Sequence, residues 1–544
     1  MRSFIAASAV LCAATLTAQV NESIEVRVVN VDVTVTSKGV PVSGLTRNDF
    51  EVFEDGKRQA ISNFYTSDET RTVAATDLTA AAGAAPDVLQ PDQRFRKRVL
   101  VLVDNNHTTR HARDTALLQL EAMINDRFHG DYEWSIGVIG RGVTLVLPLS
   151  SNKTAIHEAL EIIRHAGTRS EGMSTFAGAT GREGSMLPQT TVKSTTWSVF
   201  DRDFNDRLVQ AGTNDDAERA IASRYTTPAI IDAARGFAST PGRKIVFLLT
   251  GDPGLNDIEK VQQVGDGFVV RGVSMGKADR SNEVWAAQKI IEDARRAIIH
   301  EANASDVSFY IWNVQGLSPA GDIGVYAQPV TDTSAVFWLS NQTGGQLVTG
   351  NDPAQAVKAF DTASSNFYSL GYKPPHPDDG KYHAISVRVI RKGDYALAYR
   401  SGYSDNSTST QLERAMTSPT AAAMQTGTLP VSLALGTPAT ANNLVTVPIE
   451  IKVPFRSLQF LPSRSGAAAN VVVYVSVFND VGKNLAATRF PLNPGFKSGT
   501  PDANGMLIYR NAIQIRKGER HRVVVAVRDA IANSTGMATE VVKF

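Results

Sequence analysis

The stretch Arg98-Val-Leu-Val-Leu-Val-Asp-Asn-Asn-His-Thr-Thr109 decides the fold of this chain. Its five consecutive apolar residues, Val99 to Val103, predict a strand that is buried on both faces, as in a parallel sheet covered by helices. The next segment has helical spacing of its apolar residues, which are Ala112, Ala116, Leu117, Leu120, Met123 and Ile124. The turn between strand and helix opens with Asp104, where open α/β sheets place their ligand sites.

Strands and helices continue to alternate from this stretch to about residue 372. Lys244-Ile-Val-Phe-Leu-Leu-Thr250 is a second strongly apolar strand, and helical periodicity covers about 153–165 and 282–303. Loop-rich segments at 167–212 and 254–280 interrupt the alternation. Alternation over this length predicts an α/β fold with a doubly wound, mostly parallel sheet.

Composition and patterning divide the whole chain into six predicted parts. Short strands with period-two alternation flank the α/β region on both sides, and segments rich in Ser, Thr, Ala, Gly and Pro separate them. The parts are a signal peptide at 1–18, a small β module at 19–66, a linker at 67–97, the α/β domain with its closing strands at 98–403, a linker at 404–428, and a β-sandwich of immunoglobulin-like class at 429–544.

The N-terminus predicts export. Residues 1–18 combine the positive Arg2, an apolar core and a small residue at Ala18, which is typical of a secretory signal peptide. Cleavage would remove the only cysteine, Cys12, so disulfide and thiol chemistry are excluded from the mature chain. We therefore expect a periplasmic, cell-surface or secreted protein, with no later segment long enough to span a membrane. The 55 basic and 54 acidic side chains nearly cancel, which leaves no net field for nucleic acid.

Several motifs together point to a known family. Before the α/β region come Val31-Asp-Val-Thr-Val-Thr36 and Gly44-Leu-Thr-Arg-Asn-Asp-Phe50-Glu-Val-Phe-Glu-Asp-Gly-Lys57. Thr343-Gly-Gly-Gln-Leu347 and Tyr368-Ser-Leu-Gly-Tyr372 close the region, and Asp379-Gly-Lys-Tyr-His383 and Arg400-Ser-Gly-Tyr403 follow it. In order and spacing the chain resembles the von Willebrand factor A-related proteins common in Acidobacteria, over nearly its whole mature length. The resemblance implies a type A domain at about 98–372, flanked by the β module and the sandwich.

Type A domains often carry a metal-ion-dependent adhesion site. Its signature is Asp-x-Ser-x-Ser after the first strand, a Thr in a later loop and an Asp after the fourth strand. The resemblance implies that Mg²⁺ (or Mn²⁺ or Ca²⁺) is bound by Asp104, Asn106, Thr108, Thr168 and Asp252. This sequence departs from the signature, because Asn106 and Thr108 replace the two Ser residues and Thr250-Gly-Asp252 replaces Thr/Ser-Asp-Gly.

Two interpretations of the Asp104 turn follow. As a metal site, its residues converge with the two distant ones at the carboxyl edge of the sheet. As strand-end capping, its short polar side chains only satisfy the backbone, and partner binding would use the long loops at 167–212 and 254–280.

The function predicted from these features is binding, without catalysis. An exported, modular, nearly neutral chain whose main site resembles an adhesion site indicates an adhesion-type module for a protein or a cell-envelope or surface polymer. The alternative is a serine hydrolase that uses Ser274, because Gly272-Val-Ser-Met-Gly276 matches the Gly-x-Ser-x-Gly elbow. That elbow needs a strand before it and a helix immediately after it, whereas the next predicted helix starts near Asn282.

Overall fold

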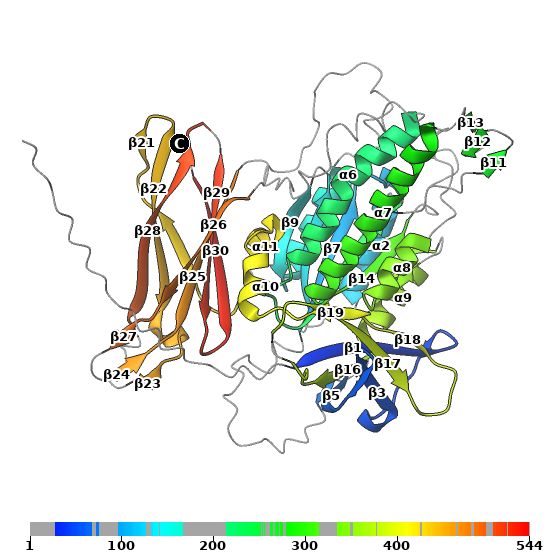
Figure 1. Ribbon diagram of the computed structural model, residues 1–544, viewed down its shortest axis with the longest axis horizontal. Coiled ribbons are helices and arrows are strands. Elements are labelled where there is room, and N and C mark those ends of the chain that lie inside the picture. Colours follow the sequence, from blue (N-terminus) through cyan, green and yellow to red (C-terminus); the bar gives the residue numbers. More distant parts are fainter. Residues whose placement is uncertain are drawn as a thin grey trace, which may run out of the picture.

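The computed structural model consists of three parts (Figure 1): an α/β body, a small β module below it, and a C-terminal β-sandwich beside it. The predicted signal peptide at 1–18 lies outside the described residues. These are 28–67, 72–74, 96–126, 132–140, 142–166, 214–251, 253, 255, 262–264, 267–270, 273–275, 279–314, 334–348, 352–376, 378–424, 427–463, 466–479, 484–496, 504–518 and 520–542.

A six-stranded sheet forms the centre of the α/β body, in the order β15-β14-β10-β7-β8-β9. Its strands are β7 (Lys97–Asp104), β8 (Tyr132–Ile139), β9 (Val143–Ser150), β10 (Arg243–Thr250), β14 (Val307–Asn313) and β15 (Leu347–Val348). Neighbouring strands run parallel except for β8 and β9, which are antiparallel. Every residue of β7 and β10 is buried, as expected of apolar runs at the centre of a covered sheet. The predicted α/β architecture is confirmed.

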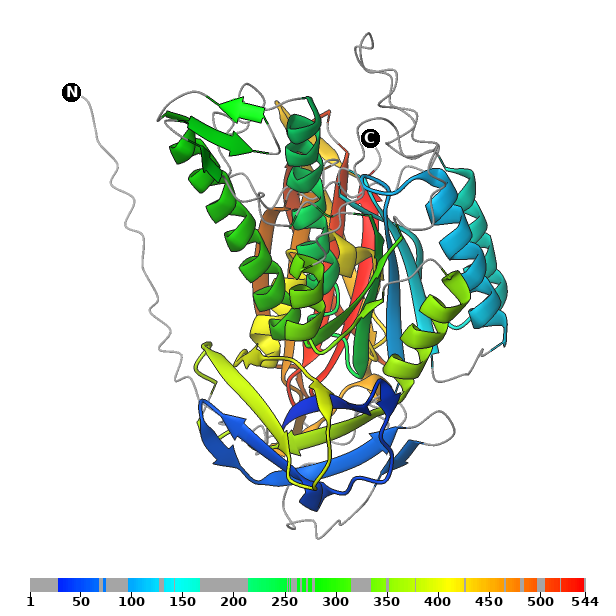
Figure 2. The same ribbon diagram turned by 90° about the vertical axis from the view of Figure 1, so that its right-hand side faces the viewer.

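Helices cover both faces of this sheet (Figures 1 and 2). Successive residues of a strand point to opposite faces, so Val99, Val101 and Val103 of β7 join one buried cluster while Leu100 and Leu102 join another. The first cluster includes side chains of α2 (Arg110–Asp126), α3 (Lys153–His165) and α9 (Pro353–Ser365). The second includes side chains of α6 (Asn214–Arg235), α7 (Asp279–Ala304) and α8 (Ser334–Gln342).

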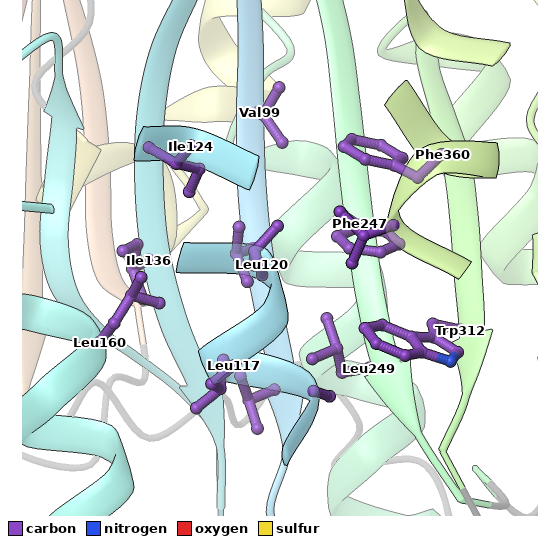
Figure 3. Close-up of a cluster of buried hydrophobic side chains, with 14 of the residues drawn as sticks. Val99, Leu117, Leu120, Ile124, Ile136, Leu160, Phe247, Leu249, Trp312 and Phe360 are labelled. Atoms are coloured by element: carbon purple, nitrogen blue, oxygen red, sulfur yellow. The ribbon is translucent and has the colours of Figure 1, made fainter. Parts of the chain in front are cut away.

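Aromatic rings fill part of the first cluster, as Figure 3 shows. Phe247 of β10 stacks on Phe360 of α9 with ring centroids 4.1 Å apart, and lies 6.2 Å from Trp312 of β14. Such pairs stabilise a core by about 0.5–1.5 kcal/mol beyond the burial of their area. The cluster therefore joins the sheet rigidly to α9, close to the point where the chain leaves the α/β body.

The small β module is built from both ends of the α/β region. Strand β1 (Val29–Ser37) pairs antiparallel with β16 (Phe367–Tyr372), which also pairs with β5 (Ile61–Ser67). Strand β3 (Phe50–Glu54) pairs with β17 (Tyr382–Val389). The remaining strands are β2 (Val40–Pro41), β4 (Lys57–Gln59), β6 (Thr72–Ala74), β18 (Ala396–Ala398) and β19 (Gly402–Ser404), and a 3-10 turn covers Arg47–Asp49.

This pairing differs from the division expected from the sequence. We placed the closing strands before residue 403 in the α/β domain and 19–66 in a module of its own, whereas β16 to β19 complete the module. The residues of both segments share one core, which includes Val31, Val52, Leu370 and Val387. Alternating apolar residues show that a strand has one buried face, but they do not identify its partner.

Residues 404–428 are not only a linker. They form α10 (Thr408–Ala415) and α11 (Pro419–Met424), whose buried residues include Leu412 and Ala421. The hydroxyls of Ser418 and Thr420 donate to the carboxylate of Asp232 in α6, over 2.7 and 2.5 Å. The Ser, Thr and Ala composition suggested a linker, but tertiary contacts with the α/β body order the segment into helices.

Two antiparallel sheets enclose the C-terminal core. One contains β20 (Ser432–Leu435), β21 (Ala439–Ala441), β22 (Leu444–Pro454) and β28 (Met506–Arg516). The other contains β25 (Val471–Asn479), β26 (Asn484–Leu492), β29 (His521–Asp529) and β30 (Ser534–Val542). Short strands β23 (Leu461–Ser463), β24 (Gly466–Ala468) and β27 (Gly495–Phe496) form a third sheet, and Phe455–Ser457 is a 3-10 turn. The packing is that of a sandwich, while the immunoglobulin-like class stays a prediction.

None of the helices among the described residues is both long enough and apolar enough to cross a membrane.

Candidate functional site

Asp104 is the last residue of β7 and its side chain is completely buried. Strands β8 and β10 flank β7 in parallel, so the three strands end at the same edge of the sheet. Thr250 ends β10, and Ile139 ends β8 directly opposite Asp104. The fold therefore places Asp104 at the carboxyl edge, where the sequence predicts the site.

Three hydrogen-bond donors surround the Asp104 carboxylate. Oδ1 accepts from the backbone N–H of Asn106 over 3.0 Å, and Oδ2 accepts from the hydroxyl of Thr250 over 2.7 Å. Nδ1 of His107 also lies 2.7 Å from Oδ2. A carboxylate offers about four lone-pair positions, so these contacts leave one position on Oδ1 among the described residues.

Asn106 and Thr108, the other two predicted ligands in this turn, are held by hydrogen bonds to neighbouring groups. The Asn106 side chain donates through Nδ2 to the carbonyl of Gly140, over 2.9 Å, and to the hydroxyl of Thr226 in α6, over 3.1 Å. Thr108 donates its hydroxyl proton to the backbone carbonyl of Asp104 over 2.7 Å. Both side chains therefore take part in capping the turn.

His107 is the residue of this turn that sequence reasoning missed. Its side chain is 8% exposed, and Nδ1 faces Asp104. Nε2 is buried and has no hydrogen-bond partner among the described residues. Thr250 was missed as a donor as well, although its place at the end of the neighbouring parallel strand could have indicated it.

Arg113 stabilises the turn from behind. This completely buried side chain donates to the side-chain carbonyl of Asn105 over 3.4 Å and to the backbone carbonyls of Arg164 and Ala166 over 3.0 and 2.9 Å. Its Nε lies 2.8 Å from Asp114, which balances the buried charge. One guanidinium thus ties the turn after β7 to the end of α3.

Of the five predicted ligands, the structure places three. Asp104, Asn106 and Thr108 lie in one turn at the carboxyl edge. Thr168 and Asp252 lie outside the described residues, so their convergence on the turn stays a prediction.

Ser274, the nucleophile of the hydrolase alternative, lies in a strand. It belongs to β13 (Val273–Met275), which pairs antiparallel with β12 (Gly267–Val270) next to β11 (Gln262–Val264). Ser274 is opposite Val269, and α7 begins at Asp279. A nucleophile elbow holds its Ser on a sharp turn between strand and helix. The extended position of Ser274 therefore lends the hydrolase alternative no support.

Histidine and carboxylate groups elsewhere in the described part of the chain can hold a cation. In three groups, one ligand atom from each residue lies within 4.8 Å of the others. The groups are His376, Asp379, His383 and Asp405; Glu54, Asp55 and His383; and Glu121, His157 and Glu161.

Comparisons with known proteins give weak similarities in fold. No family model matches the chain, and no curated protein matches it. A von Willebrand factor type A protein from Catenulispora acidiphila is 10% identical, with 91% of this chain and 72% of that chain covered at a TM-score of 0.22. An aerotolerance-related membrane protein from Bacteroides fragilis is 10% identical, covering 49% of this chain and 98% of its own at a TM-score of 0.24.

A β-glucuronidase from Bacteroides uniformis is 12% identical over 34% of this chain, at a TM-score of 0.16. The chain spans only 13–19% of the length of the Bacteroides uniformis β-glucuronidases that it matches. The solved structures that resemble this chain thus include a type A domain protein, at low similarity.

Proposed function

We propose that this protein is an exported adhesion-type module that binds another protein or a cell-envelope polymer and has no catalytic role. Binding takes place at the carboxyl edge of a von Willebrand factor A-like sheet. The observation that supports this proposal best is the buried Asp104 carboxylate, which donors from its own turn and from β10 fix at that edge. The resemblance of the quoted motifs to those of acidobacterial von Willebrand factor A-related proteins supports the same assignment.

The proposed ligand of this edge is Mg²⁺, held by Asp104, Asn106, Thr108, Thr168 and Asp252. The described residues fit such an ion in their chemistry, because a carboxylate, an amide carbonyl and a hydroxyl supply the oxygens that Mg²⁺ prefers. One lone-pair position remains on Asp104 Oδ1. Thr108 donates its proton to the Asp104 carbonyl, so it would contact the ion through its hydroxyl oxygen. A bound ion would supply an open coordination position for a carboxylate of the partner.

Thermal unfolding with and without a divalent ion tests the site. We expect millimolar Mg²⁺ or Mn²⁺ to raise the melting temperature of the full chain by mass action, with a gain of about 2.7 kcal/mol at a hundredfold excess over Kd. Asp104→Ala should abolish the gain. The matched control is Glu158→Gln, which changes an exposed acid on α3 and should keep it. An unchanged melting temperature of the wild-type chain would contradict the metal and leave strand-end capping.

Capture from envelope extracts tests the binding function itself. The immobilised wild-type chain should retain a partner that a chelator releases, and the Asp104→Ala chain should not retain it. Retention that neither the chelator nor Asp104→Ala affects would place the binding surface elsewhere, with the loops at 167–212 and 254–280 as the next surfaces to test. Ester hydrolysis abolished by Ser274→Ala would overturn the proposal in favour of an enzyme.

A further inference from the structure

Two stacked histidines lie in the β module, apart from the Asp104 edge. The rings of His376 and His383 are nearly parallel, with an interplanar angle of 18° and centroids 4.1 Å apart. His376 follows β16 and His383 lies in β17. The carboxylates around them come from three separate stretches: Glu54 and Asp55 at the end of β3, Asp379 before β17, and Asp405 after β19.

One nitrogen of each ring makes a short contact with an anchored carboxylate. His376 Nε2 lies 2.9 Å from Glu54 Oε1, and His383 Nδ1 lies 2.8 Å from Asp55 Oδ2. These are lengths of charge-assisted hydrogen bonds. The hydroxyls of Tyr372 and Tyr403 donate to Glu54 Oε2 over 2.6 and 2.9 Å. In a neutral ring, the shorter contact places the N–H on the side that faces Glu54 or Asp55.

The second nitrogen of each ring faces another carboxylate over a longer distance. His376 Nδ1 lies 3.2 Å from Asp405 Oδ2, and His383 Nε2 lies 3.2 Å from Asp379 Oδ1. A neutral imidazole has only one N–H, so its second nitrogen presents a lone pair. A lone pair that faces a carboxylate oxygen is repelled unless a proton or a cation lies between them.

The separations of these four atoms suit a cation. One ring nitrogen each of His376 and His383 and one oxygen each of Asp379 and Asp405 lie within 4.8 Å of one another. A tetrahedral Zn²⁺ site with bonds of about 2.0–2.2 Å has neighbouring ligand atoms roughly 3.3–3.5 Å apart. The two contacts of 3.2 Å are already close to this spacing. Because the two imidazole rings are nearly parallel, they must tilt toward a shared ion. The distances between ligand atoms that exceed this spacing must also shorten.

We propose that His376, Asp379, His383 and Asp405 form a structural binding site for a divalent transition-metal ion such as Zn²⁺. Two imidazoles and two carboxylates neutralise the ion and favour zinc over Mg²⁺, which prefers oxygen ligands alone. Glu54 and Asp55 orient the rings, as carboxylates commonly do behind metal-bound histidines. The side chains of His376 and Asp379 are 22% and 23% exposed, so the ion reaches the site from solvent.

The proposed ion joins the segment after β16 to β17 and to the residue that follows β19. The next contact along the chain leads into the α/β body, because Ser404 Oγ lies 3.4 Å from His300 Nε2 of α7. A filled site therefore stabilises the module where it joins the body. The site shares no residue with the Asp104 cluster, so it is independent of the proposed binding function.

Zinc titration of the full chain, stripped with a chelator beforehand, tests the site. Isothermal titration with ZnCl₂ should give one site per chain. His383→Ala should abolish binding, and Asp55→Asn should weaken it by about 10–100-fold, the usual cost of losing such an orienting carboxylate. Circular dichroism shows whether the His383→Ala variant folds. Where it does not fold, Asp379→Asn is the second test variant, because it changes a partly exposed side chain.

Two control variants locate the ion. His157→Ala removes the histidine of the exposed Glu121–His157–Glu161 group, and Asp104→Ala alters the sheet edge; both should bind zinc as the wild type does. Absence of zinc binding up to millimolar concentration would overturn the proposal. Binding that survives in both His383→Ala and Asp379→Asn, or that His157→Ala abolishes, would equally overturn it.

Discussion

The hydroxyl of Thr250, the last residue of β10, donates a 2.7 Å hydrogen bond to the carboxylate of Asp104, the last residue of β7. The two strands are parallel neighbours, with Leu249 opposite Val103, so Thr250 and Asp104 are level at the sheet edge. Both side chains are buried, which makes the bond costly to lose. The conformation of the candidate site thus depends on a strand that lies nearly 150 residues further along the chain.

Replacing Thr250 with Val should destabilise the α/β body. Val has nearly the same shape but no hydroxyl, so a buried carboxylate loses one of its three donors, at a cost of about 1–3 kcal/mol. Denaturant unfolding followed by tryptophan fluorescence measures the loss. Thr250→Ser keeps the donor and should recover most of the stability, and equal losses in the two variants would show that packing, not the hydrogen bond, is responsible.

The Gly344-Gly345 pair of the Thr343-Gly-Gly-Gln-Leu347 motif has a steric role. A Cβ at Gly345 would lie 1.9 Å from the carbonyl oxygen of Phe309 in β14, because the loop crosses the strand at close range. Gly345→Ala should therefore cost about 3 kcal/mol or more, since the backbone must move. Gly140→Ala is the matched control, because its Cβ would meet no atom within 4 Å. A melting temperature of Gly345→Ala equal to that of the control would contradict this explanation.

Helix α10 is held to the α/β body by an ion-pair triad. Glu301 of α7 contacts Arg235 of α6 over 2.8 Å and Arg414 of α10 over 2.5 Å, and its side chain is 9% exposed. Burial opposes ionisation, yet the two arginines prevail and lower the pKa of Glu301 below its usual value. Arg414→Met should destabilise the chain by about 1.5–3 kcal/mol, the range for hydrogen bonds to charged groups.

A double-mutant cycle shows whether the loss of stability comes from the Arg414–Glu301 ion pair or from packing. Arg414→Met should cost much less in a Glu301→Gln background, because neighbouring residues in one network are coupled by about 0.5–3 kcal/mol. Additive losses in the double variant would show that the two side chains do not interact in solution.

The sequence predicts those elements whose pattern is local. Helix α3 begins at Lys153 and ends at His165, the bounds that its periodicity predicts, and β7 and β10 follow from continuous apolar runs. The pairing of β1 with β16 joins residues that are more than 300 positions apart, with Val31 opposite Leu370. Its alternating pattern is compatible with many partners, so only tertiary structure selects one.

The same distinction holds for the candidate sites. Asp104 could be placed at the sheet edge because a strand and its turn are contiguous in sequence. Its contacts with Thr250 and His107 depend on strand order and on a rotamer, which no spacing rule supplies. Likewise the contacts of His376 and His383 with Glu54 and Asp55 join residues more than 300 positions apart, which no local pattern indicates.

The last prediction concerns pH and the contact between α6 and α11. The Asp232 carboxyl is 3% exposed, and burial raises its pKa above the usual 3.8, although hydrogen bonds from Thr420 and Ser418 partly oppose the shift. Between 3.8 and the raised pKa the folded chain binds more protons than the unfolded chain. The free energy of unfolding is therefore highest below this pH range. It falls as the pH rises through the pKa of Asp232 in the folded chain, by at most about 1.4 kcal/mol per pH unit.

Asp232→Asn cannot ionise and should lack this loss. Urea unfolding of both chains between about pH 4 and about pH 8 should show the variant gaining on the wild type as the pH rises, since only the wild type must bury a charge. Thr420→Val removes a donor that favours the charged form, so it should raise the pKa of Asp232 further and extend the decline to higher pH. A stability difference between wild type and Asp232→Asn that is constant with pH, or that grows in favour of the wild type, would show that Asp232 is ionised at no net cost and that its hydroxyl partners compensate fully for burial.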